Sequence, residues 1–281
     1  MPLPAMSPNN VAVVTGGASG IGLAAAMRFA KAGMKVCIAD LGAERLKEAE
    51  AKLVSVAGGA ADIMTSATDV SRVEEVMALE SAVQKRFGGT DILMNNAGIQ
   101  PGSQMFGPAE NWQRILGVNL WGVINGTQVF AQHMIERGRP GLIINTGSKQ
   151  GITTPPGDPA YNVSKAGVKA LTEALQHELR ELDSKISAHL LIPGFVFTGL
   201  TSRGRTEKPA AAWTAEQTVD FMIEKLEAGD FYILCPDNDV SRQLDERRIL
   251  WAAGDIVENR PPLSRWHKDY AEAFAAFVKQ G

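Results

Sequence analysis

Cysteine is nearly absent from this chain. Its 281 residues include only Cys37 and Cys235, which lie far apart inside apolar runs. A disulfide framework or a zinc site needs more cysteines at closer spacing, so we expect neither. Histidine is also scarce, and its four copies lack the spacing of metal ligands. We therefore expect no metal site, and a reducing cytoplasm is the simplest location for the protein.

An excess of basic residues is lacking as well. The chain has 28 Lys and Arg residues against 31 Asp and Glu, a net charge of -3. Proteins that bind nucleic acid or an anionic membrane usually present a basic surface, so we expect neither partner. No stretch approaches the roughly 18 uninterrupted apolar residues of a membrane span. The N-terminal stretch MPLPAMSPNN has neither the basic start nor the apolar core of a secretory signal.

What the chain does have is a strict alternation of two patterns. Short β-rich apolar runs lie at 11–15, 35–40, 63–68, 91–96, 141–146, 185–192 and 231–235. Segments with helical periodicity separate them, at 20–32, 42–57, 72–87, 110–137, 160–182 and 215–228. This alternation predicts a single α/β domain over residues 1–281, with a doubly wound, mainly parallel sheet of about seven strands and helices on both faces.

The last segment, residues 236–281, departs from the alternation. The stretches SRQLDERRILWAAG and RWHKDYAEAFAAFVKQ predict two helices, separated by NRPPL. We expect this C-terminal extension to cap a sheet edge or to form a subunit contact rather than a separate domain.

A glycine-rich turn follows the first predicted strand. In VVTGGASGIG, Gly16, Gly20 and Gly22 lie between the strand and an alanine-rich helix. Glycines let the backbone approach a pyrophosphate, whose charge is met by N–H groups at the start of the helix. Gly20, Gly22 and Ala25 also satisfy the pattern G-x-G-x-x-A. That register begins five residues beyond the strand, so the pattern from Gly16 fits better. On its own, such a turn is as often a bare strand-to-helix loop.

Asp40 ends the second predicted strand, 24 residues after Gly16. A carboxylate at this point can accept hydrogen bonds from the ribose hydroxyls of an adenosine. It would also repel the 2′-phosphate of NADP, and the following Leu41 supplies no cation. The position therefore favours NAD as cofactor. The alternative interpretation is an aspartate that caps the next helix.

Two further polar turns follow the third and fourth strands. Asp69 and Val70 come after the third, and the sequence NNAG, from Asn95 to Gly98, comes after the fourth. An aspartate here could hold an adenine amino group, and the Asn-Gly turn could run along a cofactor. Because Asp and Asn favour caps and turns in any case, each signal gains meaning only from the others.

Tyr161 and Lys165 are four residues apart in a predicted helix, which places them on one face. A phenol has an unperturbed pKa near 10, about three units too high for a base at neutral pH. A nearby cation stabilises the phenolate and lowers this pKa. Ser148 lies 13 residues before Tyr161, at the end of a strand, where its hydroxyl could stabilise a developing alkoxide. Together the three side chains suit acid/base chemistry on an alcohol.

These motifs resemble those of the short-chain dehydrogenase/reductase family. TGGASGIG, Asp40, Asp69, NNAG, Asn119 in GVNLWG, Ser148, YNVSK and the PG at 193–194 follow the family's order from about residue 11 to 200. The resemblance implies a Rossmann-like single domain, a nicotinamide cofactor, and hydride transfer to or from a carbonyl or alcohol. It also implies a homodimer or homotetramer.

The resemblance also assigns roles to residues. Tyr161 would be the general acid/base, Ser148 the donor to the substrate oxygen, and Lys165 the residue that holds the nicotinamide ribose. Asn119 would hold a water that leads protons toward the lysine. The implied cofactor-binding residues are Gly16, Ser19, Gly20, Ile21, Gly22, Asp40, Asp69, Val70, Asn96, Gly98, Tyr161, Lys165, Pro193, Gly194, Val196 and Thr198.

Substrate choice is less visible in the sequence. By resemblance, residues 199–214 form a lid over the pocket, and the apolar residues in and before it favour an apolar inner face. Its charged residues would form a hydrated outer face or grip an acid. Our candidates for substrate contact are Gln100, Gln150, Phe195, Leu200 and Trp213.

The sequence thus predicts an NAD-dependent dehydrogenase that acts on a bulky, apolar secondary alcohol or its ketone. A small-molecule substrate is the one partner that we expect besides further copies of the chain. Two alternatives stay open. A non-catalytic NAD-sensing or scaffold protein on the same fold would explain Asp40, but it gives no reason for an intact Ser148, Tyr161 and Lys165. An NADPH-dependent carbonyl reductase needs phosphate recognition that Asp40 disfavours.

Overall fold

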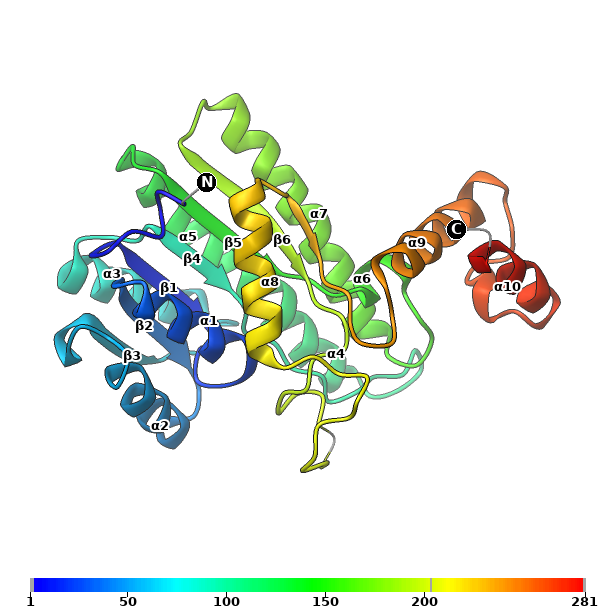
Figure 1. The fold of residues 1–281 in the computed structure, drawn as a ribbon, viewed down its shortest axis with the longest axis horizontal. Coiled ribbons are helices and arrows are strands. Elements are labelled where there is room, and N and C mark those ends of the chain that lie inside the picture. The colour runs from blue at the N-terminus through cyan, green and yellow to red at the C-terminus, as the bar shows by residue number, and fades with distance from the viewer. Residues whose placement is uncertain (1–2, 203, 280–281) are drawn as a thin grey trace.

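The computed structural model describes residues 3–202 and 204–279. Its strands form one parallel sheet of seven, in the order β3-β2-β1-β4-β5-β6-β7 (Figure 1). The predicted doubly wound α/β fold is therefore confirmed. The strands are β1 (Val11–Thr15), β2 (Lys35–Asp40), β3 (Ile63–Ala67), β4 (Ile92–Asn95), β5 (Gly141–Thr146), β6 (Ile186–Ile192) and β7 (Tyr232–Leu234).

The central strands are buried along their whole length, as their continuous apolar sequences require. Every residue of β1, β4 and β5 is buried. Strand order reverses at β1, which pairs with β2 on one side and with β4 on the other. Such a reversal opens a crevice at the carboxyl ends of the strands, where doubly wound sheets bind ligands.

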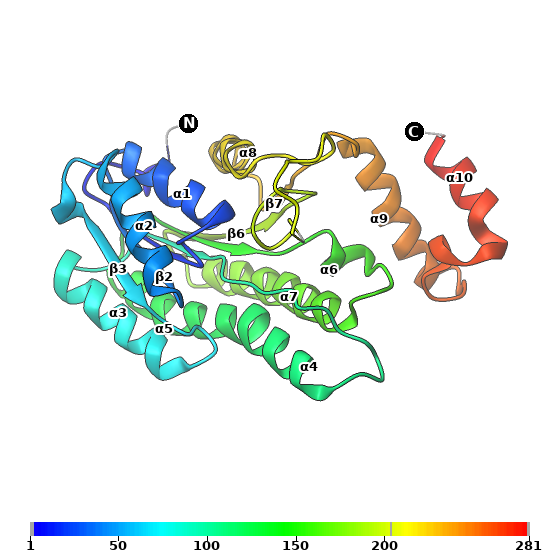
Figure 2. The same ribbon diagram turned by 90° about the horizontal axis from the view of Figure 1, so that it is seen from below.

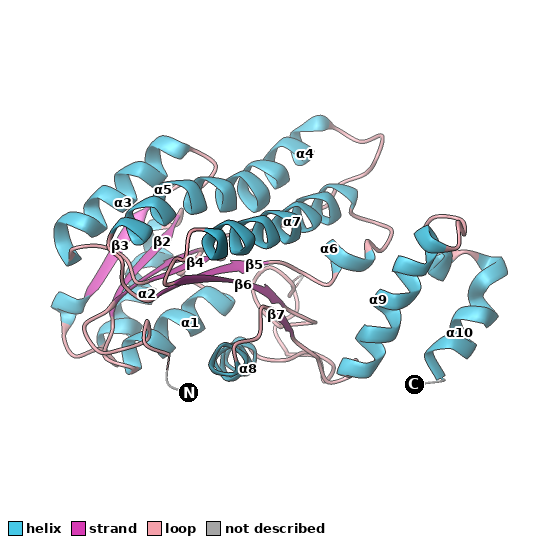
Figure 3. Ribbon diagram, turned by 90° about the horizontal axis from the view of Figure 1, so that it is seen from above, coloured by secondary structure: helices cyan, strands magenta, loops and turns pink. Residues whose placement is uncertain are grey.

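Helices cover both faces of the sheet (Figures 2 and 3). One face packs against α1 (Gly20–Lys31), α2 (Ala43–Val54) and α8 (Ala215–Ala228), around buried Phe29, Leu53 and Met222. The other packs against α3 (Val73–Phe87), α5 (Gly122–Glu136) and α7 (Pro159–Glu181), around buried Leu79, Phe130 and Leu179. The two cores hold the strands in place, so that the loops at their carboxyl ends extend from a fixed framework.

The long helix predicted at 110–137 is not continuous. It consists of α4 (Ala109–Leu116), a π-helical segment Gly117–Trp121, and α5. The apolar periodicity continues through all three parts, so the pattern does not reveal the wider turn. A short helix, α6 (Gln150–Thr153), follows β5 and was not predicted.

The C-terminal extension projects beyond the β7 side of the sheet, as the orange and red ribbon in Figure 1 shows. It contains α9 (Arg242–Val257) and α10 (Ala271–Lys279). The expected second helix is shorter than predicted, because 265–270 falls largely in two 3-10 turns, Ser264–Trp266 and Lys268–Tyr270. The Trp251 ring packs edge-on against Phe274 and Phe277, which joins α9 to α10. None of the helices described is long and apolar enough to cross a membrane.

Candidate active site

The glycine turn after β1 is too tight for side chains. Gly16 has a φ of +63°, and a Cβ there would lie 2.7 Å from the Cα of Ala97. A Cβ on Gly22 would lie 2.2 Å from the carbonyl oxygen of Gly16. The Asn96 side chain holds the turn by donating to the carbonyl oxygens of Thr15 and Gly16, at 3.2 and 3.3 Å. The turn leads directly into α1, so its shape fits a pyrophosphate at the start of that helix.

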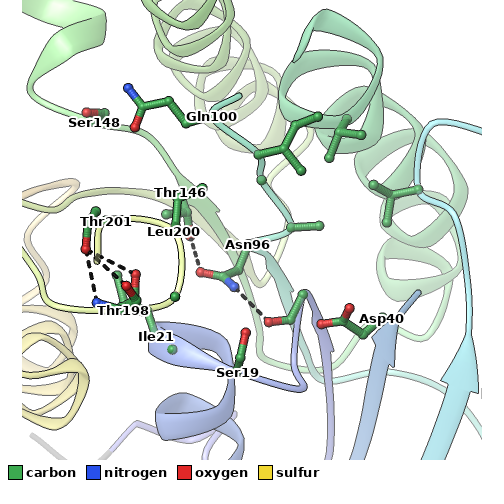
Figure 4. Close-up of a pocket in the computed structure, with 18 of the residues that line it drawn as sticks. Ser19, Ile21, Asp40, Asn96, Gln100, Thr146, Ser148, Thr198, Leu200 and Thr201 are labelled. Carbon is green, nitrogen blue, oxygen red and sulfur yellow. Dashed lines mark hydrogen bonds between the residues drawn. The ribbon is translucent and has the colours of Figure 1, made fainter. Parts of the chain in front are cut away.

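Asp40 lies at the far end of the same crevice, at the end of β2. Its carboxylate accepts from the backbone N–H of Ala18 at 3.2 Å and of Leu41 at 2.8 Å. The N-cap of α2 is Gly42, so the alternative interpretation of Asp40 as a helix cap is wrong. The carboxylate faces the crevice, where it could accept from ribose hydroxyls (Figure 4).

Arg45 is a neighbour of Asp40 that the sequence argument missed. Its guanidinium lies 3.4 Å from the Asp40 carboxylate and lines the same crevice. The sequence shows that Leu41 supplies no cation, but a side chain one turn into α2 does. Helical spacing from the end of the strand was the signal available for it.

One cavity of about 600 Å³ joins the crevice to the predicted catalytic residues. Figure 4 shows part of it, with Asp40 and Ser148 on opposite sides and Asn96 between them. Most of the predicted site residues line this cavity. They are Gly16, Ser19, Gly20, Ile21, Asp40, Asp69, Val70, Asn96, Gly98, Gln100, Ser148, Tyr161, Lys165, Pro193, Gly194, Val196, Thr198 and Leu200.

Five predicted site residues do not line the cavity, namely Gly22, Asn119, Gln150, Phe195 and Trp213. Trp213 corrects the substrate prediction most clearly, because its ring packs against Phe221 of α8 with centroids 5.7 Å apart. Its backbone pairs with Phe195, whose carbonyl oxygen accepts from the Trp213 N–H at 2.9 Å. Both residues therefore brace the base of the lid, and Gln150 begins α6 outside the cavity wall.

Tyr161 and Lys165 lie on the first two turns of α7 and are both buried. The Lys165 ammonium is 5.8 Å from the centroid of the tyrosine ring and donates to the Thr146 carbonyl oxygen at 2.8 Å. Burial lowers the pKa of Lys165 to about 8, since the charged form loses its water. The predicted pair therefore shares one wall of the cavity.

Burial has the opposite effect on the phenol. It raises the pKa of Tyr161 to about 12, although a hydrogen bond with the Ser148 side chain works against this. The Asp158 carboxylate raises the pKa further. We expected Lys165 to bring this pKa down, but the lowering influence here is the Ser148 hydrogen bond, and burial outweighs it. A working base here needs additional positive charge, which the ring of an oxidised nicotinamide carries.

Asn119 lies in the π-helical segment and is fully buried. Its side chain accepts from the Ile99 N–H at 2.8 Å and donates to the Ile99 carbonyl oxygen at 2.9 Å. A Cβ on Gly98 would lie 3.5 Å from this side-chain oxygen and 3.9 Å from the lysine nitrogen, so Asn119 stands close to Lys165. Single π-helical turns are often found at functional sites.

Ser103 is a second contributor that the sequence argument missed. Its hydroxyl donates to the Asp158 carboxylate at 2.5 Å and accepts from the Ala160 N–H at 2.9 Å. It thereby fixes the loop after β4 to the first turn of α7, next to Tyr161. A serine in a loop carries no sequence signal for such a contact.

Comparison with known proteins agrees with this geometry. The family model for short chain dehydrogenases matches residues 10–209. The chain is 36% identical over 194 residues to 3-oxoacyl-(acyl-carrier-protein) reductase FabG of Thermotoga maritima, covering 69% of this chain and 76% of that protein. It is 37% identical over 203 residues to 3beta-hydroxysteroid dehydrogenase 1 of Eggerthella lenta, covering 72% of this chain and 76% of that protein.

A solved structure extends the likeness to nearly the whole chain. It is a short chain dehydrogenase/reductase from Burkholderia phymatum in complex with NAD, with a TM-score of 0.82 and 30% sequence identity. The match covers 92% of this chain and 97% of that one. The motifs, the sheet order and these similarities agree, so this chain belongs to the short-chain dehydrogenase/reductase family of oxidoreductases.

Proposed function

We propose that this protein is an NAD-dependent dehydrogenase that oxidises a secondary alcohol, or reduces the corresponding ketone. The observation that carries the proposal is the grouping of Ser148, Tyr161 and Lys165 at one end of a cavity whose other end holds Asp40. A non-catalytic NAD sensor needs Asp40 to bind the cofactor, but it does not need the other three side chains. The retained acid/base group therefore favours an enzyme.

The chain's own residues account for the movement of the proton. In the oxidation, the Tyr161 phenolate accepts the proton of the substrate hydroxyl, while Ser148 donates a hydrogen bond to the same substrate oxygen. Lys165 stabilises the phenolate by its charge. Asn119 holds the loop at Ile99 in place through two hydrogen bonds. A bound nicotinamide supplies the hydride acceptor, or the donor in the reverse direction.

The residues around the crevice fit such a cofactor. The glycine turn would hold the pyrophosphate, Asp40 the adenosine ribose, and Asp69 with Val70 the adenine. The loops around Asn96, Gly98 and Pro193 to Thr198 would enclose the nicotinamide end. Each of these segments contributes residues to the lining of one cavity.

NADP is the second candidate cofactor, and Arg45 is the observation that favours it. Its guanidinium could pair with a 2′-phosphate if it moved away from Asp40. Asp40 disfavours NADP, because its carboxylate faces the position of the 2′-phosphate and would repel it. We propose NAD as the preferred cofactor and assign Arg45 a role in holding the Asp40 carboxylate.

A bulky, apolar substrate fits the part of the cavity around Tyr161. Ile99, Pro101, Val118 and Leu200 contribute apolar surface to the cavity, and Ile99 packs in the same cluster as Tyr161. The named substrate class of the Eggerthella lenta relative, a hydroxysteroid, has the same character. We propose a polycyclic or similarly large alcohol as substrate.

We further propose that the protein acts as a homodimer or homotetramer in the cytoplasm, with no nucleic-acid or membrane partner. Both cysteines are buried and unpaired, as a reducing compartment favours. Ile256 and Val257 of α9 are 85% and 84% exposed, and a subunit contact would cover them.

The first test is a screen of the purified protein at about 340 nm, the absorbance of a reduced nicotinamide, with NAD and NADP in parallel. The panel contains aliphatic, aromatic, steroid and sugar alcohols. We expect turnover with NAD on large apolar alcohols, and a loss of at least about 100-fold in Tyr161→Phe. Retention of most activity in Tyr161→Phe would refute the assigned mechanism.

The cofactor preference is tested by paired variants. Asp40→Ala should reduce the preference for NAD over NADP about tenfold or more, because it removes the ribose acceptor and the repulsion of the phosphate. Arg45→Ala in that background should then abolish the gain with NADP. If wild type already prefers NADP, the assignment of Asp40 is wrong.

A further inference from the structure

A buried ion cluster lies directly beside the proposed catalytic serine. Lys149 follows Ser148 in the chain, and its ammonium lies 2.5 Å from the Asp245 carboxylate and 3.5 Å from that of Asp237. The side chains of the two aspartates are only 5% and 6% exposed. Ions buried to this degree lose hydration energy and are stable only with close partners. The cluster therefore imposes a defined geometry on the segments that meet there.

Asp237 joins the cluster to the start of the lid. It lies in the turn after β7, and its carboxylate accepts from the Phe195 N–H at 3.1 Å. It also accepts from the Val240 N–H at 2.8 Å, which fixes the turn itself. Phe195 immediately follows Gly194, where the chain enters the segment that covers the cavity.

The next residue, Asn238, holds the other end of the lid. Its side-chain amide donates to the Ala210 carbonyl oxygen at 2.6 Å, and its backbone N–H donates to that of Ala211 at 3.1 Å. The two ends of the lid thus converge on one short turn. Between them, Leu200 and Thr201 line the cavity.

Asp245 brings the C-terminal extension into the same cluster. It lies on the first turns of α9, and α9 contacts α6, the short helix that follows Lys149 (Figure 2). The outer face of α9 carries exposed charges instead, such as Glu246, which pairs with Arg242 at 2.7 Å. Asp245 therefore joins α9 to the catalytic loop by an ion pair, beside the apolar contact that Ile249 makes with the same region.

We propose that Lys149, Asp237 and Asp245 are positioning residues that tie the C-terminal extension to the Ser148 loop and to both ends of the lid. The extension then serves to hold the lid over the cavity. The expected effect of these residues on turnover rests on the proposed function. Their expected effect on the order of the lid does not.

The test compares Asp245→Asn with Glu246→Gln, its neighbour on the exposed face of α9. Both changes remove one carboxylate charge from the same helix, and only the first touches the cluster. Asn238→Ala is a milder third variant, because Asn238 is exposed and outside the cluster. The first readout is cleavage by trypsin within the lid, after Arg205, followed by mass spectrometry on the full-length protein.

We expect Asp245→Asn and Asn238→Ala to accelerate lid cleavage at least fivefold, with Glu246→Gln at the wild-type rate. The second readout is kinetic. The KM for the alcohol should rise at least fivefold in Asp245→Asn, because Leu200 and Thr201 of the lid line the cavity. The Kd for NAD should rise as well, because Asp237 anchors Phe195 in the loop that would enclose the nicotinamide end.

If Asp245→Asn and Asn238→Ala both fold and their lids are cleaved at the wild-type rate, the proposal is overturned, whatever their turnover. Faster lid cleavage in Glu246→Gln, to the same extent as in Asp245→Asn, would also overturn it, because it would indicate general loosening of the fold. A wild-type enzyme without turnover on any alcohol would refute the proposed function instead and would leave the proteolysis result interpretable.

Discussion

Replacing Lys165 by methionine tests whether its charge tunes Tyr161. Methionine keeps the length and the burial of the side chain and removes the charge. The ammonium lies 5.8 Å from the centroid of the tyrosine ring. The charge of a phenolate is spread over its oxygen and its ring, so we take about 6 Å as the separation of the two charges; at an effective dielectric constant of about 20 they interact by about 3 kcal/mol, equivalent to about 2 pKa units. The variant should therefore have an apparent pKa for Tyr161 about 2 units above the wild-type value.

A higher pKa of Tyr161 should slow alcohol oxidation at low pH. Alcohol oxidation needs the phenolate, so the rate rises with pH until the apparent pKa is reached. Below the wild-type value, Lys165→Met should be about 100-fold slower, and its rate should go on rising after that of the wild type has levelled off. The measurement is kcat/KM for an alcohol against pH at saturating NAD.

Lys169→Met provides the matched control. Lys169 lies one turn further along α7 and pairs with Glu173 at 2.8 Å, away from the cavity. Its profile should coincide with that of the wild type. If Lys165→Met instead lowers the rate equally at every pH, the lysine acts by holding the cofactor and does not tune the tyrosine.

Two further predictions concern the cofactor turn and the pH profile. Gly22→Ala places a Cβ 2.2 Å from the Gly16 carbonyl oxygen, so it should weaken NAD binding by more than about 100-fold in a fluorescence titration; wild-type affinity would contradict the role of the turn. Asp158→Asn removes a charge that raises the pKa of Tyr161, so the rising limb of the oxidation profile should move to lower pH. A limb that stays in place or moves up would show that the Asp158 charge does not act on the phenol.

The sheet could be predicted from the sequence because its strands are covered on both faces. Seven apolar runs matched seven strands, and the differences lay at their ends. The run 91–96 is longer than β4 by one residue at each end. Asp91 uses its carboxylate to accept from the Val11 N–H at 2.8 Å, and Asn96 already turns toward Thr15. Both contacts involve a neighbouring strand, so the run itself carries no trace of them.

The catalytic candidates were found because their spacing is local. Tyr161 and Lys165 share one helix, and Ser148 follows the end of strand β5 by two residues. Residues that act across the fold were missed. Ser103 reaches Asp158 only after separate segments have packed together. Arg45 lies only five residues after Asp40 and was missed because Leu41 alone was considered as a source of positive charge.

Two of the substrate candidates, Phe195 and Trp213, do not line the cavity, for a different reason. Phe195 and Trp213 are apolar and flank the lid, which predicts a pocket wall and a core contact equally well. In the structure, their backbones pair with each other and the Trp213 ring turns toward α8. In a segment without regular periodicity, the sequence does not show which side of the chain faces inward.

The loops that line the cavity leave the carboxyl ends of the parallel strands, and this has a practical consequence for protein engineering. The turns at the amino ends of the strands, such as those at Gly88, Gly138 and Gly229, have open space around them. Each follows a helix and leads back into the amino end of a strand. An affinity tag, a fluorescent label or an inserted domain should be tolerated there without disturbing turnover. The molecule therefore offers a handle for immobilisation on the side away from its chemistry.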